Sequence, residues 1–434
     1  MISSGHEDRA DGRALQGLLR YDELDDLARE TGALKRNRKL HPIMILEGLL
    51  ATSGDGNGRL AGALDYVRWT YGIEANRSAI YKRATAEFSA FAQAVCQTVL
   101  ERRIASEHPE MKGRLAAFRD LWAYDSTTVR LRSGLAEVFS SGARVKDRAG
   151  VKLHGAVSLR SAAVMQMKLT EEKVADVKAI DLGKSFEDVL VLLDRGYGAH
   201  RLFASIDEGG GAYVTRLKLS SNPTVTAVRR GRPRRGSAKG MSLDDAIDAG
   251  LIKVGTVSDI DVEIRVSKDQ VHAARVVGVP RTKEDGTVET WWYLTNLDRD
   301  RFPPEVLVEL YRMRWEVELL WKQLKSRFRL ADIDTLTQHN VEMLMHVSVL
   351  AYALTAGVLD AVTTPEERET LSLGQLATSA RYIMAHLVRF LEADTSNERA
   401  ELAGDLRRKV MLSAQDSNPK RTRKAKRRRK LADG

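Results

Sequence analysis

The feature that most constrains the fold is the continuous apolar run Val189–Leu193, which Asp194 follows directly. Such a run is typical of a central strand that is buried on both faces of a sheet. A helix over about 182–190 is expected to lead into it. The other strand-like segments lie at 118–131, 151–160, 164–173 and 211–218. Three strands followed by alternating helices and strands predict an α/β sheet with at least some parallel pairing.

The regions beside this sheet differ in character. Residues 14–105 carry apolar residues at helical spacing. After residue 217, a polar loop rich in Arg and Gly is followed by four β-type segments, at 250–259, 262–269, 271–285 and 287–297. Pro303 and Pro304 open a helix that we expect to run to about Phe328. The predicted units are a helical N-terminal domain (1–115), a first core part (116–216), a β-rich antiparallel insertion (217–298), a second core part (299–335), a helical C-terminal domain (336–415) and a disordered basic tail (416–434).

Length and composition exclude several classes of protein. A chain of 434 residues predicts two to four folded units, and a hydrophobic fraction of 43% can fill their cores. The single cysteine, Cys96, excludes an internal disulfide and a cysteine-cluster zinc site, and we expect it in a helical core. No stretch approaches the roughly 20 apolar residues of a membrane span. We expect a soluble, cytoplasmic protein with no membrane partner.

The net charge of +10 is concentrated in two short basic runs. Residues 420–430 hold nine Lys or Arg and no acid, and residues 229–235 hold five more, so the rest of the chain is slightly acidic. Basic arms on a nearly neutral body are typical of nucleic-acid contact, although such runs also occur as solvated tails.

A helix-turn-helix is one interpretation of the helical N-terminal region. A turn over residues 71–76 would be followed by a helix that Ser78 caps, and this helix would present Lys82 and Arg83 to DNA. An ordinary helical bundle explains the same pattern equally well.

The sharpest local pattern lies on the helix predicted after Pro304. Tyr311, Arg314, Glu318 and Lys325 lie at offsets of 0, 3, 7 and 14. At roughly 100° per residue they fall within a sector of about 60°, on one face of a helix, whereas Glu316 points away. One acid flanked by two cations and a ring suits a metal-bound phosphate. Taken alone, the pattern also fits an amphipathic helix with surface charges.

Two aspartates supply the remaining acids that metal chemistry needs. Asp125 and Asp194 each follow an apolar run, at the predicted ends of strands in the α/β region. Carboxylate oxygens suit Mg²⁺ or Mn²⁺. Two such ions about 3.5–4 Å apart can activate a nucleophile and stabilise the leaving oxygen of a phosphodiester. Asp125, Asp194 and Glu318 meet this requirement if the sheet places the two strand ends side by side.

The spacing Tyr311-x2-Arg314-x3-Glu318-x6-Lys325 matches the Y-R-E-K signature of the insertion-sequence-four family of bacterial DDE transposases. The segments around the two aspartates and residues 27–50 also resemble that family, and the resemblance covers roughly residues 20–395. It implies a ribonuclease-H-like core that a β insertion interrupts. It further implies that Asp125, Asp194 and Glu318 bind two Mg²⁺ ions, which Mn²⁺ can replace.

The resemblance also implies roles in DNA binding. Arg314 and Lys325 would hold the strand at the element end, and Tyr311 would contact the adjacent phosphate or base. Trp291 would stack on a flipped base, or one of Trp291 and Trp292 would simply pack under the insertion.

Weaker candidates for DNA contact are three arginines. Arg230 and Arg232 resemble a minor-groove hook but also suit plain backbone contact. Arg195 could reach a phosphate or pair with a neighbouring acid. His154, on a core strand, is better explained as a structural residue.

The leading hypothesis is cut-and-paste transposition by a homodimer that pairs two element ends and joins them to target double-stranded DNA. The alternatives are a nuclease of the same fold without strand transfer, and a non-catalytic DNA-binding regulator that descends from a transposase.

Overall fold

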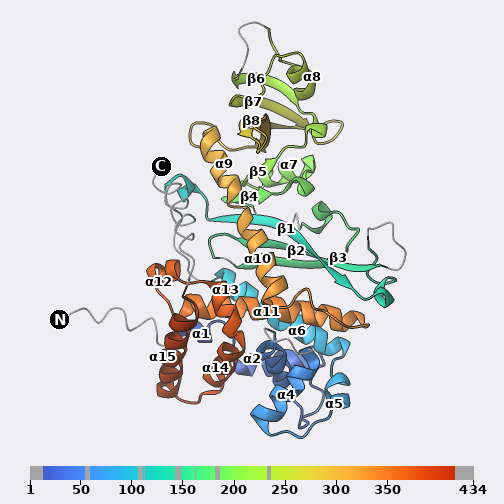
Figure 1. The fold of residues 1–434 in the computed structure, drawn as a ribbon, viewed down its shortest axis with the longest axis vertical. Coiled ribbons are helices and arrows are strands. Elements are labelled where there is room, and N and C mark those ends of the chain that lie inside the picture. The colour runs from blue at the N-terminus through green and yellow to red at the C-terminus, as the bar shows by residue number, and fades with distance from the viewer. Residues whose placement is uncertain are drawn as a thin grey trace, which may run out of the picture.

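The computed structural model describes residues 13–53, 59–105, 111, 113–141, 148–161, 163–180, 186–231 and 236–415. Its central feature is one mixed sheet, in which nine described strands lie in the order β3-β2-β1-β4-β5-β9-β8-β7-β6 (Figure 1). The strands are β1 (Asp120–Leu131), β2 (Ala149–Ser158), β3 (Val164–Glu171), β4 (Val189–Leu193), β5 (Ala212–Arg216), β6 (Thr224–Arg230), β7 (Ser258–Arg265), β8 (Val271–Thr282) and β9 (Val288–Thr295).

The sheet is parallel only at its centre. β4 pairs in parallel with β1 and with β5, whereas the pairs from β1 to β3 and from β5 through β9 to β6 are antiparallel. All five residues of β4 are buried, as the apolar run predicts for a strand covered on both faces. The α/β class predicted from sequence is therefore confirmed.

Helices from both ends of the chain pack together below the sheet in Figure 1. They are α1 (Arg13–Gln16), α2 (Tyr21–Glu30), α3 (Pro42–Ala51), α4 (Arg59–Tyr71), α5 (Arg77–Tyr81), α6 (Ala86–Ala105), α11 (Gln338–Ala361), α12 (Pro365–Thr370), α13 (Leu373–Leu376), α14 (Ala380–Glu392) and α15 (Ser396–Ser413). α11 packs along α6, and α14 packs on α3. The two helical regions therefore share one hydrophobic core.

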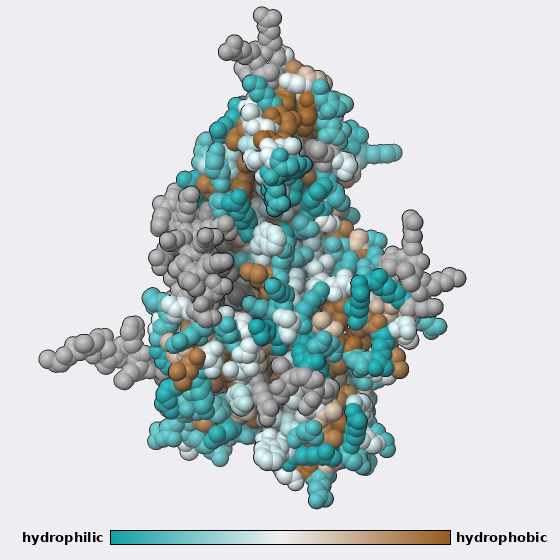
Figure 2. Space-filling model, in the orientation of Figure 1, coloured by the Kyte–Doolittle hydropathy of each residue, from teal (hydrophilic) through white to brown (hydrophobic). Residues whose placement is uncertain are grey.

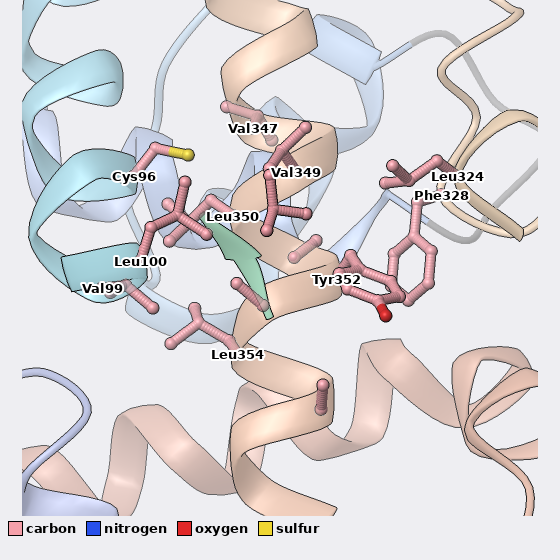
Figure 3. Packing of buried hydrophobic residues seen from close by; sticks show 14 of the residues in the cluster. Cys96, Val99, Leu100, Leu324, Phe328, Val347, Val349, Leu350, Tyr352 and Leu354 are labelled. Atoms are coloured by element: carbon pink, nitrogen blue, oxygen red, sulfur yellow. The ribbon is translucent and has the colours of Figure 1, made fainter. Parts of the chain in front are cut away.

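Figure 3 shows the contact between α6 and α11, where Cys96 points into the core beside Leu350. Cys96 is buried, so the prediction of a small core residue is confirmed. Among the described helices, α11 alone is long and apolar enough to cross a membrane, but 94% of its apolar window is buried inside the protein. The face in Figure 2 is mostly hydrophilic, with apolar residues in separate patches.

Glu47, on α3, is a buried acid within this helical core. Its side chain is only 4% exposed and accepts a hydrogen bond from the Tyr71 hydroxyl. Burial raises the pKa of Glu47 to about 7; Tyr71 opposes this rise, and Glu392 adds to it. The folded protein holds this proton more tightly than the unfolded chain. The contribution of Glu47 to the free energy of unfolding is therefore largest below the ordinary pKa of a glutamate and is lost as the pH rises towards 7.

Glu47→Gln is therefore expected to stabilise the protein at pH 8 by on the order of 2 kcal/mol and to change little near pH 4.5. Urea unfolding of parent and variant at both pH values measures the difference. If parent and variant differ by the same free energy of unfolding at both pH values, the raised pKa of Glu47 is contradicted.

The prediction of secondary structure before β4 is wrong. The helix expected over 182–190 does not reach its predicted end, because Asp188 has a φ of 54° and residues 189–190 already belong to β4. The Asp188 N–H donates to Gly210 O at 3.1 Å, which aligns the chain with the next strand. Residues 181–185 lie outside the described residues.

The segment 250–259 is not a strand over most of its length, since β7 begins only at Ser258. Its apolar residues Leu251 and Ile252 instead pack with the core of β6–β9, beside the short helix α8 (Leu243–Asp248). The preceding segment, expected to be a loop, contains both β6 and α8.

Candidate active site

Register within the sheet places Asp125 and Asp194 side by side. In the parallel pair, Tyr124 of β1 lies opposite Leu193 of β4, and each aspartate is the next residue. Asp194 follows the end of β4, as predicted. Asp125 does not end its strand, because β1 continues to Leu131 through its antiparallel pairing with β2. The prediction of two strand ends is thus corrected: Asp125 lies where the parallel pairing ends.

The third acid, Glu318, comes from a helix that packs on β1. This helix, α10 (Trp315–Ser326), lies close because β2 has a glycine directly opposite Asp125. A Cβ on Gly155 would lie 2.6 Å from Trp321 Cη2. Since any larger residue would meet the Trp321 ring, Gly155 allows the helix to approach the strands that carry the aspartates.

The single long helix predicted from Pro304 to Phe328 is wrong, because the structure divides it into α9 (Pro304–Arg312) and α10. The backbone remains helical at Met313 and Arg314, but their N–H groups donate to carbonyls three residues back. This tighter turn is 3₁₀-like. Tyr311 therefore lies at the end of one helix, and Glu318 lies in the next.

The Arg314 guanidinium lies among the three acids. Its Nη2 donates to Glu318 Oε1 at 2.5 Å, and its Nη1 lies 4.0 Å from Asp125 Oδ2. Burial lowers the pKa of Arg314, but Tyr311, Glu318 and Asp194 together raise it above its ordinary value. Arg314 is only 7% exposed. The structure thus places it against the acids, under the surface rather than on it.

Electrostatic repulsion among the acids is visible at Asp125. Burial raises the pKa of Asp125 to about 6, and the charges of Asp194 and Glu318 add to this rise. The Ser126 backbone N–H and Arg314 oppose it. A site where carboxylates repel one another is stabilised by a cation.

The donor set suits a hard divalent cation, since all three groups are carboxylates. Among the residues that the structure describes, no three acids, His or Cys lie close enough together to hold an ion as they stand. Arg314 supplies the positive charge between Asp125 and Glu318 in this arrangement.

A cleft of about 580 Å³ opens over Asp125 and Glu318, and Asp194 is not among its lining residues. Its lining residues come from β1, from α10 and from the segment after α10: Asp125, Ser126, Thr127, Glu318, Trp321, Lys322, Lys325, Ser326 and Ala331. The sequence predicted Asp125, Glu318 and Lys325. It missed Trp321 and Lys322, which lie three and four residues after Glu318, a spacing that could have identified them.

Two members of the four-residue signature occupy different environments. Lys325 lines the cleft, where burial lowers its pKa and Asp125 opposes this effect. Tyr311 is buried, and its ring makes an edge contact with Tyr293 at 5.2 Å between centroids.

The structure distinguishes the two neighbouring tryptophans of β9. Trp292 is buried against Gly278, whereas Trp291 remains partly exposed. Arg216 and Arg281 each place a guanidinium carbon 3.9 Å from the centroid of the Trp291 ring. The face of the Trp291 ring is thus covered by two guanidinium groups, and Trp292 is the one that packs inside.

The structure describes two of the three other arginine candidates, Arg195 and Arg230. Arg195 is exposed in the turn after Asp194, and no ion pair joins it to a described residue. Arg230 is at the end of β6, and its Nη1 lies 3.5 Å from Glu305 Oε1. Arg232 lies outside the described residues.

The helix expected after the turn over residues 71–76 is present, but it is short and Ser78 does not cap it. α5 has five residues, Asn76 caps it, and a separate α6 begins at Ala86. Lys82 is exposed at the end of α5, whereas Arg83 donates to Leu40 O at 2.7 Å. His154 is a buried core residue that contacts Thr170 at 2.8 Å.

Comparison with known proteins adds independent information. Residues 116–354 match the family described as Transposase DDE domain. The transposase for insertion sequence element IS231E of Bacillus thuringiensis subsp. finitimus is 22% identical over 371 residues, which cover 77% of each chain. The putative transposase InsL for insertion sequence element IS186A of Escherichia coli (strain K12) is 23% identical over 362 residues, 79% of this chain and 91% of that one.

Among solved structures, the piggyBac transposase synaptic complex with hairpin DNA has a TM-score of 0.46 and 11% identity, over 94% of this chain and 86% of that chain. The matched family region includes the segments that carry all three acids.

Proposed function

The chain belongs to the transposase DDE-domain family and is a DNA transposase of the insertion-sequence type, and we propose that Asp125, Asp194 and Glu318 are its catalytic acids. The family resemblance inferred from sequence is thereby confirmed. The observation that supports the proposed site is that Arg314 pairs with Glu318 and lies 4.0 Å from Asp125, while the register of β1 and β4 places Asp194 beside Asp125.

We further propose that these acids hold two Mg²⁺ ions, which Mn²⁺ can replace. Bound there, the ions would activate a water or a DNA 3′-hydroxyl and stabilise the leaving oxygen. Lys325 and Lys322 lie along the cleft beside Asp125 and Glu318, where their charges suit the phosphates of a DNA strand. Arg314 donates a hydrogen bond to the Glu318 carboxylate, and metal coordination would replace this bond.

The order β3-β2-β1-β4-β5 supports a ribonuclease-H-like core, and β6–β9 extend it as the insertion. In this proposal residues 1–115 bind the element ends, residues 336–415 form a homodimer, and the basic tail adds affinity for DNA. Trp291 would stack on an unpaired base of the DNA once a guanidinium of Arg216 or Arg281, both of which lie over its ring, moves to a phosphate. The proposal places the enzyme in the cytoplasm, on the nucleoid.

The experiment incubates the purified protein and Mg²⁺ with precut element ends and a plasmid. We expect joining of the ends to the plasmid, because one metal site can serve both cleavage and transfer. Cleavage without joining would indicate a nuclease, and binding of ends without either reaction would indicate a regulator.

A further inference from the structure

We propose that Asp176 is a positioning residue that fixes the separation of the segments carrying Asp125 and Asp194. This inference rests on the proposed function of those two aspartates. Asp176 opens the short 3₁₀ turn η4 (Asp176–Ala179), which follows β3. It is far in sequence from both aspartates, yet its carboxylate contacts a neighbour of each.

One oxygen of Asp176 contacts the strand of the first aspartate. Oδ1 accepts a hydrogen bond from Ser126 Oγ at 2.8 Å, and Ser126 directly follows Asp125. Because the Ser126 backbone N–H also donates to Asp125 Oδ1 at 2.8 Å, fixing Ser126 also fixes this carboxylate.

The other oxygen lies against the turn after the second aspartate. A Cβ on Gly196 would lie 3.0 Å from Asp176 Oδ2, so the turn η5 (Arg195–Tyr197) fits closely against the carboxylate. Asp194 immediately precedes this turn. The parallel pairing of β1 and β4 ends one residue before the two aspartates. Beyond that point, the Asp176 carboxylate lies between the residue after Asp125 and the turn after Asp194, and so connects the two segments.

Lys152, on β2, balances the charge of Asp176. Its Nζ donates to Asp176 Oδ1 at 3.2 Å and to Val174 O at 2.9 Å. His154 Nδ1 lies 3.5 Å from the same oxygen, and burial lowers the pKa of His154 to about 4, so its ring is neutral at pH 7. A carboxylate already paired with an ammonium is a poor fourth metal ligand but a good rigid support.

The test measures Mn²⁺ binding to the full-length protein by calorimetry, together with strand cleavage. Asp176→Asn is expected to weaken Mn²⁺ binding at least about tenfold and to slow cleavage, with binding of element ends in the absence of metal unchanged. Asp405→Asn is the matched control, because it also removes an aspartate–lysine pair, with Lys409 at 2.6 Å, but on α15. It is expected to bind Mn²⁺ as the parent does.

A folded Asp176→Asn protein with parental Mn²⁺ affinity and cleavage would overturn the inference. If this variant does not fold, Ser126→Ala and Gly196→Ala remove or crowd the same contacts, and parental Mn²⁺ affinity in both would overturn it equally. Asp125→Asn is measured alongside. If it keeps Mn²⁺ affinity, the proposed catalytic site is wrong; if it loses affinity while Asp176→Asn keeps it, only the role of Asp176 is wrong.

Discussion

Asp125→Asn is expected to abolish cleavage and end joining, with a loss of at least about 1,000-fold, because an amide replaces a carboxylate ligand. The substitution keeps the size of the side chain and an oxygen that can accept the Ser126 backbone N–H. Binding of element ends should therefore persist. Single-turnover cleavage and a gel-shift assay measure the two properties separately.

A pair of glutamates on α10 provides a matched control for the claim that activity requires the site's carboxylates. Glu318→Gln should lose activity as Asp125→Asn does, because Glu318 lines the cleft. Glu316→Gln makes the same chemical change two residues earlier, on a residue that does not line it. Equal losses of activity in the two glutamine variants would mean that a disturbed α10 causes the loss, and not the removal of the Glu318 carboxylate.

Gly155→Ala is expected to slow cleavage by roughly 100-fold, because a displacement of about 1 Å at an active site has that effect. The added Cβ would lie 2.6 Å from Trp321 Cη2, so α10 must shift, and Glu318 lies one turn before Trp321. Overpacking of this kind also costs about 1–3 kcal/mol of stability. Cleavage assays and urea unfolding measure the two effects.

The double variant Gly155→Ala/Trp321→Leu tests the cause of that loss. Leucine is smaller than the indole, so the helix can approach the strands again, and part of the activity should return. If Trp321→Leu adds its own loss to that of Gly155→Ala without rescue, contact between these two residues does not position Glu318.

The central strand and the common face of Glu318 and Lys325 were predictable from the sequence because their signals are local. The apolar run Val189–Leu193 identifies a buried strand wherever it lies, and the shared face of Glu318 and Lys325 on α10 needs only helical geometry. The end of β4 at Asp194 follows from the polar residue itself.

The features that could not be predicted depend on contacts between residues that lie far apart in the chain. β1 continues past Asp125 because β2 pairs with it, and nothing in residues 120–131 shows where parallel pairing stops. The position of Arg314 depends on a tightened turn and on acids from two other strands. Asp176 reaches Ser126 across 50 residues of sequence, so no motif could have joined them.

The central claim is that Asp125, Asp194 and Glu318 together hold the metal ions. The most direct test is a crystal structure of the protein with Mn²⁺, in which anomalous scattering locates the ion. We expect Mn²⁺ at about 2.0–2.4 Å from carboxylate oxygens of these three residues, with the hydrogen bond between Arg314 and Glu318 broken. Mn²⁺ bound elsewhere, or bound while that hydrogen bond remains and Glu318 takes no part, would contradict the account.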